Sequence, residues 1–172
     1  MKIKVIKTGF LEENCYILEK NNKCIIIDPG DEFEKIKNEI SNEVLAVLIT
    51  HRHFDHIGAL DELINEYKVP VYEKMNLEET NYKIDDFEFN AIFFPGHTTD
   101  SVAYYFYKEN VMFTGDFLFY HTVGRCDLEG GSFEQMQDSI EKIKKNKKDI
   151  VLYPGHGEKT TLEEEKKNNP YF

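Results

Sequence analysis

The chain has 172 residues, and its 41% hydrophobic and 13% aromatic content excludes a disordered protein and suffices for one buried core. Its 21 basic and 32 acidic residues give a formal net charge of −11, which disfavours nucleic acid and anionic membranes as partners. No segment approaches the roughly 20 apolar residues that span a bilayer, and the N-terminus lacks the apolar stretch of a signal peptide, so we expect a cytoplasmic protein.

Short strands and amphipathic helices follow one another along the chain. Charged and apolar side chains alternate from 2 to 8, and two apolar segments flank Asn21-Asn22, which is typical of a hairpin. The predicted strands cover 2–8, 14–19, 23–27, 44–50, 69–72, 87–94, 102–107, 111–114 and 150–153. The predicted helices cover 33–40, 59–67, 133–145, which Ser132 caps, and 161–168, while 75–82 is expected as a short helix or a loop.

The predicted strands form two groups, and each group has helices beside it in the sequence. Two mixed sheets packed face to face, with helices on both outer faces, are the simplest arrangement that buries all of these apolar surfaces. We therefore expect an α/β (α+β) protein with the four layers αββα, formed by a single domain over residues 1–172.

One short stretch is unusually dense in side chains that bind metals. The segment Thr50-His51-Arg52-His53-Phe54-Asp55-His56 directly follows an apolar run and contains three of the six histidines. Imidazole and carboxylate groups together suit a borderline divalent ion such as zinc, and they also accept iron or manganese. A structural histidine needs no such crowding, so this segment indicates a metal site.

Three further apolar runs each end in a potential ligand. Runs over 92–96, 111–115 and 151–155 lead into His97, Asp116 and His156. Each pattern predicts a buried strand that is interrupted by Pro or Gly and followed by a polar residue. Ligands placed just past strand ends converge on one edge of a sheet. The complete set of five histidines and two aspartates provides more ligands than one tetrahedral zinc ion binds, and it fits two metals that share a carboxylate.

In these motifs the chain resembles the metallo-β-lactamase superfamily, and within it the glyoxalase II-type hydrolases (hydroxyacylglutathione hydrolase-like). The motifs are His51-x-His53-x-Asp55-His56, 95–101 around His97, 113–119 with 124–127, 154–157 around His156, and the opening segments 14–16 and 27–30. The resemblance implies the αββα fold. The chain departs from the family pattern at Asp100, where Gly is usual, and we expect it to lack the C-terminal helical domain that helps glyoxalase II hold glutathione.

The resemblance also implies the roles of the ligands. One divalent metal would be bound by His51, His53 and His97, and the other by Asp55, His56 and His156, with Asp116 as the bridge. The implied reaction is hydrolysis of a small thioester such as a hydroxyacylglutathione by metal-bound hydroxide, which Asp55 orients as a catalytic residue. Zinc is the expected metal, with iron or manganese as alternatives.

Other functions on the same scaffold remain open at this point. They are a mononuclear iron persulfide dioxygenase-like oxidoreductase, a lactonase or other ester hydrolase, and a metal-binding module without catalysis. The complete ligand set argues against the last of these. His121, Arg125 and Tyr16 are candidate substrate contacts, and Asp28 is a candidate for orienting a ligand histidine or stabilising a turn. The expected partner is a small acyl substrate, and the oligomeric state stays open.

Overall fold

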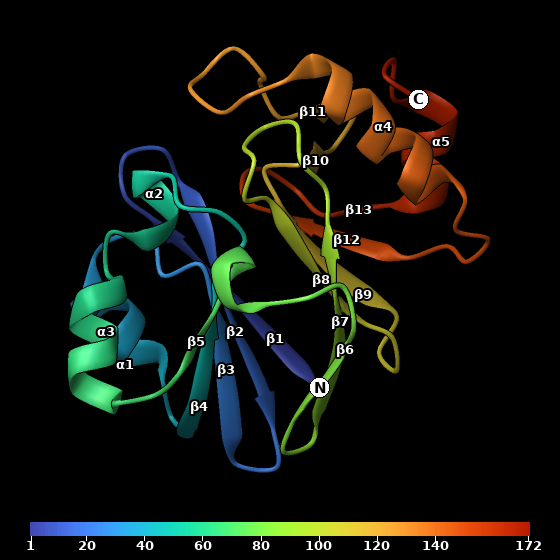
Figure 1. Ribbon diagram of the computed structural model, residues 1–172. Coiled ribbons are helices and arrows are strands. Elements are labelled where there is room, and N and C mark those ends of the chain that lie inside the picture. Colours follow the sequence, from blue (N-terminus) through green and yellow to red (C-terminus); the bar gives the residue numbers. More distant parts are fainter.

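Two β-sheets stacked face to face form the centre of the protein, and helices cover both outer sides (Figure 1). The computed structural model describes all residues from 1 to 172. One apolar cluster fills the space between the sheets. A second lies between the first sheet and its helices, and a third lies between the second sheet and its helices. These layers confirm the predicted αββα sandwich.

The first sheet has five strands in the order β1-β2-β3-β4-β5. Their bounds are β1 Lys2–Thr8, β2 Glu13–Lys20, β3 Lys23–Ile27, β4 Glu43–Leu48 and β5 Val71–Tyr72. Pairing is antiparallel among β1, β2 and β3, whereas β4 is parallel to both β3 and β5. Parallel neighbours require a crossover, and these crossovers contain the helices α1 Phe33–Glu39, α2 Phe54–Ile57 and α3 Leu60–Tyr67.

Strand β3 shows how the sequence pattern produces the layers. Its side chains are buried on both faces, because successive residues of a strand point in opposite directions. Ile25 and Ile27 contact the second sheet, whereas Cys24 and Ile26 pack in the outer cluster that includes Leu63 of α3. A continuous apolar run is therefore needed here, in contrast to the charged and apolar alternation of the edge strand β1.

The second sheet has six strands in the order β13-β12-β9-β8-β7-β6. Their bounds are β6 Asn81–Ile84, β7 Phe87–Phe93, β8 Val102–Phe106, β9 Val111–Gly115, β12 Val151–Pro154 and β13 Thr160–Thr161, beside a separate hairpin of β10 Leu118–Phe119 and β11 Thr122–Val123. Only β9 and β12 pair in parallel. Helices α4 Phe133–Lys144 and α5 Leu162–Asn168 cover the outer face, where Met136 and Leu162 pack with Met112.

The helices are short, and side chains cap the N-termini of the two helices α4 and α5. The side chain of Ser132 accepts a hydrogen bond from the backbone N–H of Gln135 and caps the 12-residue helix α4, as predicted. Thr161 caps α5 in the same way through the N–H of Glu164. None of the helices combines the length and hydrophobicity that a membrane crossing needs.

The structure contains several short elements that sequence periodicity did not reveal. Where a short helix or loop was predicted over 75–82, a three-residue 3-10 helix precedes the edge strand β6, whose burial is only partial. Strand β6 pairs with β7 through a tight turn in which Asp85 has a φ of 51°. Helix α2 and strands β10, β11 and β13 have four residues or fewer, too few to show a period.

Backbone hydrogen bonds join the two sheets at one edge of the sandwich. The N–H of Asn14 in β2 donates to the carbonyl of Gly155, just after β12, at 2.7 Å. The N–H of Val102 in β8 donates to the carbonyl of Thr50, just after β4, at 2.8 Å. This joined edge holds the ends of β4 and β12 together, and the predicted ligand segments follow directly from those ends.

Candidate metal centre

A cluster of imidazole and carboxylate side chains occupies the joined edge of the sandwich. Its members come from the loop after β4, from α2, and from the segments that follow β7, β9 and β12. They are His51, His53, Asp55, His56, His97, Asp116 and His156. The structure therefore brings together every residue that was predicted from the sequence as a metal ligand.

Helix α2 distributes two of these side chains within the cluster. It is a single turn that begins directly after its cap residue His53. Successive helical residues are rotated by about 100°, so Asp55 and His56 point to different parts of the site. Asp55 faces His156, with Oδ2 and Nε2 3.1 Å apart, whereas His56 faces Asp116, with Nε2 and Oδ1 3.3 Å apart.

Three imidazoles form the first group of donor atoms. Nδ1 of His53 lies 3.1 Å from Nε2 of His51 and 2.9 Å from Nε2 of His97. Nitrogen ligands of a tetrahedral ion lie about 3.3 Å apart when the metal–nitrogen bonds are about 2.0–2.1 Å long. The three nitrogens are therefore spaced as ligands of one divalent ion.

A carboxylate and two imidazoles form the second group. Oδ2 of Asp55 lies 3.1 Å from Nε2 of His156 and 3.9 Å from Nε2 of His56. The ligand atoms of this group also lie within 4.8 Å of one another. This mixed oxygen and nitrogen set suits a second divalent ion.

Asp116 lies between the two groups. Its Oδ1 approaches Nε2 of His56 at 3.3 Å, while its Oδ2 lies 3.5 Å from Nε2 of His97 and 3.7 Å from Nε2 of His156. His97 belongs to the first group, and the other two histidines belong to the second. One carboxylate is therefore within reach of both groups.

Backbone carbonyls fix the orientation of two imidazoles. Nδ1 of His97 donates to the carbonyl of Arg125 at 2.7 Å, and Nδ1 of His156 donates to the carbonyl of Leu11 at 3.1 Å. Because Nδ1 carries the proton in these bonds, the lone pair of a neutral ring is left on Nε2, which faces the centre. The loops that carry Leu11 and Arg125 thus hold these two imidazoles with Nε2 directed at the metal site.

Asp28 orients a third imidazole and also joins the turn after β3 to the segment after β4. Its Oδ2 accepts from Nδ1 of His56 at 2.9 Å, and its two oxygens accept from the N–H and the hydroxyl of Thr50 at 2.7 Å and 2.6 Å. Asp28 is buried and adopts a φ of 49°. Of the two roles that the sequence left open for this residue, the orientation of a ligand histidine is therefore present in the structure.

We expect Asp28→Asn to weaken metal binding about 10- to 100-fold, the usual effect of removing the partner of a ligand histidine. Asparagine keeps the size of the side chain but presents an uncharged amide to His56 and Thr50. Competition with a chromophoric chelator measures the affinity. The matched control is Asp61→Asn, an exposed position on α3. Equal affinities of the two variants would show that Asp28 does not support the site.

Gly155 allows the chain directly after β12 to pass close to two ligands. A Cβ atom at this position would lie 2.2 Å from Oδ1 of Asp116 and 2.6 Å from Cε1 of His56. Both distances are far below van der Waals contact, so any other residue would displace the ligands. The glycine of the Pro-Gly-His pattern around the last ligand is therefore required for steric reasons.

Burial and charge give the ligands different protonation behaviour. Burial and the neighbouring imidazoles lower the pKa of His51 well below its usual value, which keeps this ring neutral. Burial disfavours a charge on His56 as well, but Asp116 and Asp28 outweigh it and raise the pKa of His56. The negative charges of these carboxylates therefore favour a cation at the centre of the cluster.

Two unpaired polar atoms show that the site fits a divalent cation. Nε2 of His56 and Oδ1 of Asp116 are fully buried, face each other, and have no hydrogen-bond partner. Buried polar groups without partners are rare because they lose their hydration without compensation. Both atoms are donors of lone pairs to borderline metals, so a cation coordinated by them would satisfy them together.

Glu13 lies close to His56, and no motif indicated it. Its side chain is fully buried, with Oε2 accepting from the hydroxyl of Thr8 at 2.8 Å and Oε1 3.8 Å from Nδ1 of His56. Burial raises the pKa of this carboxyl well above its usual value. An acidic residue just before the apolar run 15–18 of strand β2 was the signal that could have revealed it.

Two of the predicted substrate contacts do not face the centre. Tyr16 is 3% exposed and lies between the sheets, where its hydroxyl donates to the carbonyl of Pro154 at 2.5 Å. His121 turns towards α5, with Nε2 2.6 Å from Oε1 of Glu164. The structure does not support a substrate contact for either residue, because Tyr16 has no free surface and His121 faces away from the cluster.

A cleft of about 380 Å³ opens above the cluster. The ligand side chains form its floor, and Leu11, Phe54, Arg125 and Leu128 form its rim. The guanidinium of Arg125 is exposed and pairs with the carboxylate of Asp127 at 2.7 Å. The cleft has the dimensions of a small-molecule site, and Arg125 is the one predicted substrate contact that lines it.

An αββα sandwich that gathers five histidines and two aspartates under an open cleft defines a metallo-hydrolase. The model of the metallo-beta-lactamase superfamily matches residues 8–91 and 82–156, and the chain belongs to this superfamily. This membership confirms the family resemblance of the sequence motifs. Membership of this superfamily and the clustered ligands together support metal binding and hydrolysis.

Two relatives match along nearly their whole length. The probable metallo-hydrolase YqgX of Bacillus subtilis (strain 168) is 33% identical, and the alignment covers 100% of this chain and 98% of that protein. The hydroxyacylglutathione hydrolase GloC of Haemophilus influenzae is 30% identical, with the same two coverages of 100% and 98%.

Two solved structures share the complete fold. The crystal structure of the BLEG-1 B3 metallo-beta-lactamase superposes with a TM-score of 0.93 at 30% identity and covers 99% of both chains. The structure of TTHA1623 in a di-iron-bound form superposes with a TM-score of 0.88 at 30% identity, covering 98% of this chain and 100% of the other.

Proposed function

We propose that the protein is a dinuclear metal-dependent hydrolase that cleaves a small thioester of the hydroxyacylglutathione type. The observation that carries this proposal is the division of the ligand atoms into two groups with one carboxylate between them. One divalent ion would be held by His51, His53 and His97, the other by Asp55, His56 and His156, and Asp116 would be shared. Zinc is the expected metal, because imidazole and carboxylate at this spacing suit it.

The relatives support this choice of reaction. GloC is described as a hydroxyacylglutathione hydrolase, and 98% of its length aligns with this chain. That activity therefore occurs in a relative of comparable extent. The cleft above the cluster, of about 380 Å³, is large enough for an acyl group and part of a thiol.

Divalent ions in such a site supply Lewis acidity towards a carbonyl group and lower the pKa of water towards neutrality. Burial opposes the ionisation of Asp55, but the hydrogen bond with His156 lowers the pKa of this carboxyl, so it is ionised at neutral pH. Asp55 accepts a hydrogen bond from the attacking water and orients it. The water oxygen bonds to the acyl carbon as the carbon–sulfur bond breaks, and one water proton passes to the departing thiolate.

Iron in the same cluster is the second candidate, because TTHA1623 was solved in a di-iron-bound form. Imidazole and carboxylate ligands accept iron as well as zinc. A single iron ion would favour a persulfide dioxygenase-like oxidoreductase over a hydrolase. Metal identity and stoichiometry therefore separate the two functions.

The deciding experiment measures metal content and turnover on one sample. The protein is purified without added metal, its metals are quantified per chain, and hydrolysis of S-D-lactoylglutathione is followed on the same preparation. We expect about two zinc ions per chain together with turnover. One iron ion per chain without turnover would contradict the proposal, and oxygen uptake with a persulfide would then test the oxidoreductase.

A further inference from the structure

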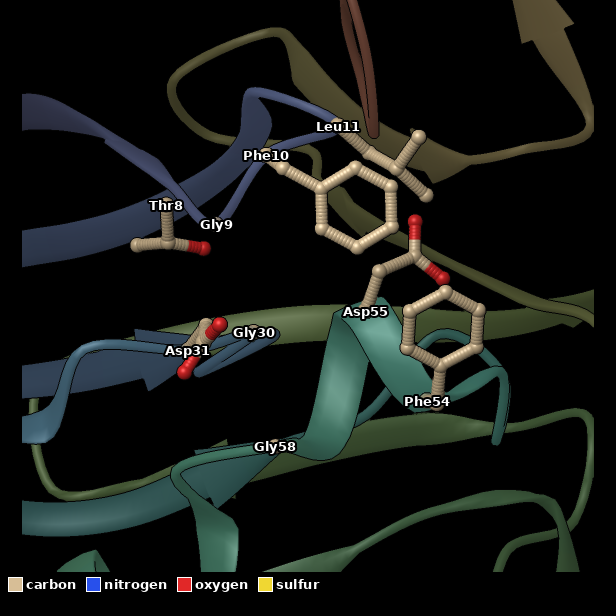
Figure 2. Close-up of a pocket in the computed structure, with 9 residues that line it drawn as sticks. All are labelled: Thr8, Gly9, Phe10, Leu11, Gly30, Asp31, Phe54, Asp55 and Gly58. Atoms are coloured by element: carbon tan, nitrogen blue, oxygen red, sulfur yellow. The ribbon is translucent and has the colours of Figure 1, made fainter.

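A second cavity lies beside the cleft, and Asp55 lines both of them. It has a volume of about 250 Å³ and is formed by the loop between β1 and β2, the turn after β3 and the helix α2. Figure 2 shows the rings of Phe10 and Phe54 beside the carboxylate of Asp55, with Asp31 at the opposite end of the cavity. None of the residues discussed so far as metal ligands, apart from Asp55, lines this space.

The cavity shares its apolar wall with the cleft. Leu11, Phe54 and Asp55 line both spaces, so a molecule whose reacting carbonyl lies over the ligands can extend into the cavity without a break. A group bound there would be attached directly to the reacting centre. The cavity is therefore placed as a subsite for one end of the substrate.

Two aromatic rings at the mouth of the cavity are unusually exposed. Phe10 is 82% exposed and Phe54 is 64% exposed, and their rings stack with centroids 6.3 Å apart and planes at 19°. Leu11, beside them, is 44% exposed. Clustered apolar surface of this kind marks a binding site, because water contact with it is unfavourable until a ligand covers it.

The charges around the cavity exclude an anionic ligand. No lysine, arginine or histidine lines it, and Asp31, which is not one of the metal ligands, contributes a negative charge at its end away from the cluster. The whole chain also carries a net charge of −11. A carboxylate entering the cavity would lose hydration and meet like charges, whereas an uncharged hydrocarbon group would meet aromatic rings.

We propose, building on the proposed hydrolase function, that this cavity binds an uncharged apolar group of the thioester substrate. The preferred substrates would then be thioesters with an aliphatic or aromatic tail of several carbons. The carboxylates of glutathione would gain nothing from the cavity. The tail belongs either to the acyl group or to the thiol, and the experiment below separates these two sources.

The test compares two series of thioesters on the metal-loaded protein. The first series carries acetyl to hexanoyl groups on the neutral thiol N-acetylcysteamine, and the second carries an acetyl group on alkyl thiols of increasing length. We expect kcat/KM to rise by up to about fourfold per methylene in one series, the value of a fully buried methylene. The series that responds identifies the part of the substrate in the cavity.

A charged probe tests the electrostatic part of the proposal. Adipoyl and hexanoyl thioesters have chains of equal length, but the first ends in a carboxylate and the second in a methyl group. We expect the hexanoyl thioester to be preferred at least about tenfold, and Asp31→Asn to reduce that preference, because the variant removes one of the like charges. Equal turnover of the two probes would overturn the exclusion of anions. If the thiol series responds, the matched probes carry the carboxylate or the methyl group on the thiol.

Two variants locate the effect in the cavity. Phe10→Ala and Phe54→Ala should each lower the ratio of kcat/KM between the longest and shortest substrates of the responding series by about fivefold or more. Met75→Ala is the control, since Met75 is also 82% exposed but lies outside the cavity. It should leave the ratio unchanged, and equal melting temperatures would show that all three variants are folded.

The outcomes separate the two proposals. If neither S-D-lactoylglutathione nor any member of the two series is hydrolysed by the metal-loaded protein, the proposed function itself fails. If thioesters are hydrolysed but neither series shows a dependence on chain length, the hydrolase stands and the apolar subsite is overturned. A dependence that survives both phenylalanine substitutions would place the subsite elsewhere in the cleft.

Discussion

Replacing Asp116 by asparagine is expected to lower kcat/KM for thioester hydrolysis by about three orders of magnitude. One oxygen of this carboxylate faces His56 at 3.3 Å, and the other lies 3.5 Å from His97 and 3.7 Å from His156. Asparagine keeps the shape but removes the negative charge and one of the two oxygen donors. A loss of this size corresponds to about 4 kcal/mol of transition-state stabilisation, in the range that metal activation contributes.

The measurement pairs steady-state kinetics with the number of metal ions per chain. We expect the Asp116→Asn variant to retain fewer than two ions, because both groups lose a common ligand. Asp138→Asn, at an exposed position on α4, is the control and should behave as the parent protein. A variant with full activity and an unchanged metal content would show that Asp116 is not a shared ligand.

Removing the metal is expected to lower the free energy of unfolding by about 4 kcal/mol for each bound ion, compared with protein at a free metal concentration 1,000 times the dissociation constant. The reason is that the ligands come from positions between 51 and 156 and assemble only in the folded chain. For a domain of this size the change per ion corresponds to a drop of roughly 10 °C in the melting temperature.

Thermal unfolding with a chelator, and again after zinc is restored, measures this effect. The restored sample should regain its melting temperature, which would distinguish metal linkage from damage by the chelator. The Asp116→Asn variant should show a smaller difference between the two conditions. A melting temperature that is the same with and without zinc would contradict binding at the cluster, since any ligand specific to the native state must stabilise it.

The layers of the fold and the position of the cluster were predictable from local patterns. The strand over 23–27 was predicted with the bounds that the structure shows, because a continuous apolar run is typical of a buried strand. The ligands were predictable because each follows such a run. Their division around Asp116 was expected from the family resemblance and not from local patterns, since it depends on the rotation between Asp55 and His56 within a helix of four residues.

Apart from the contact of Asp28 with His56, the contacts around the ligands could not be predicted, because they depend on tertiary neighbours. Tyr16 lies in β2, a central strand that is buried on both faces, so its ring was drawn into the inter-sheet core. His121 adopts a φ of 58°, which directs the chain and the imidazole towards α5. The cavity behind Asp55 requires the packing of three separate segments, and no short motif encodes it.

The hydrogen bonds that orient His97 and His156 bear on how such proteins diversify. Their acceptors are the backbone carbonyls of Arg125 and Leu11, which any amino acid at these positions would provide. The side chains of the same two residues lie on the rim of the cleft. Mutations at the rim can therefore change which molecules are accepted without disturbing the metal ligands, so selection can explore new substrates while the catalytic apparatus stays intact.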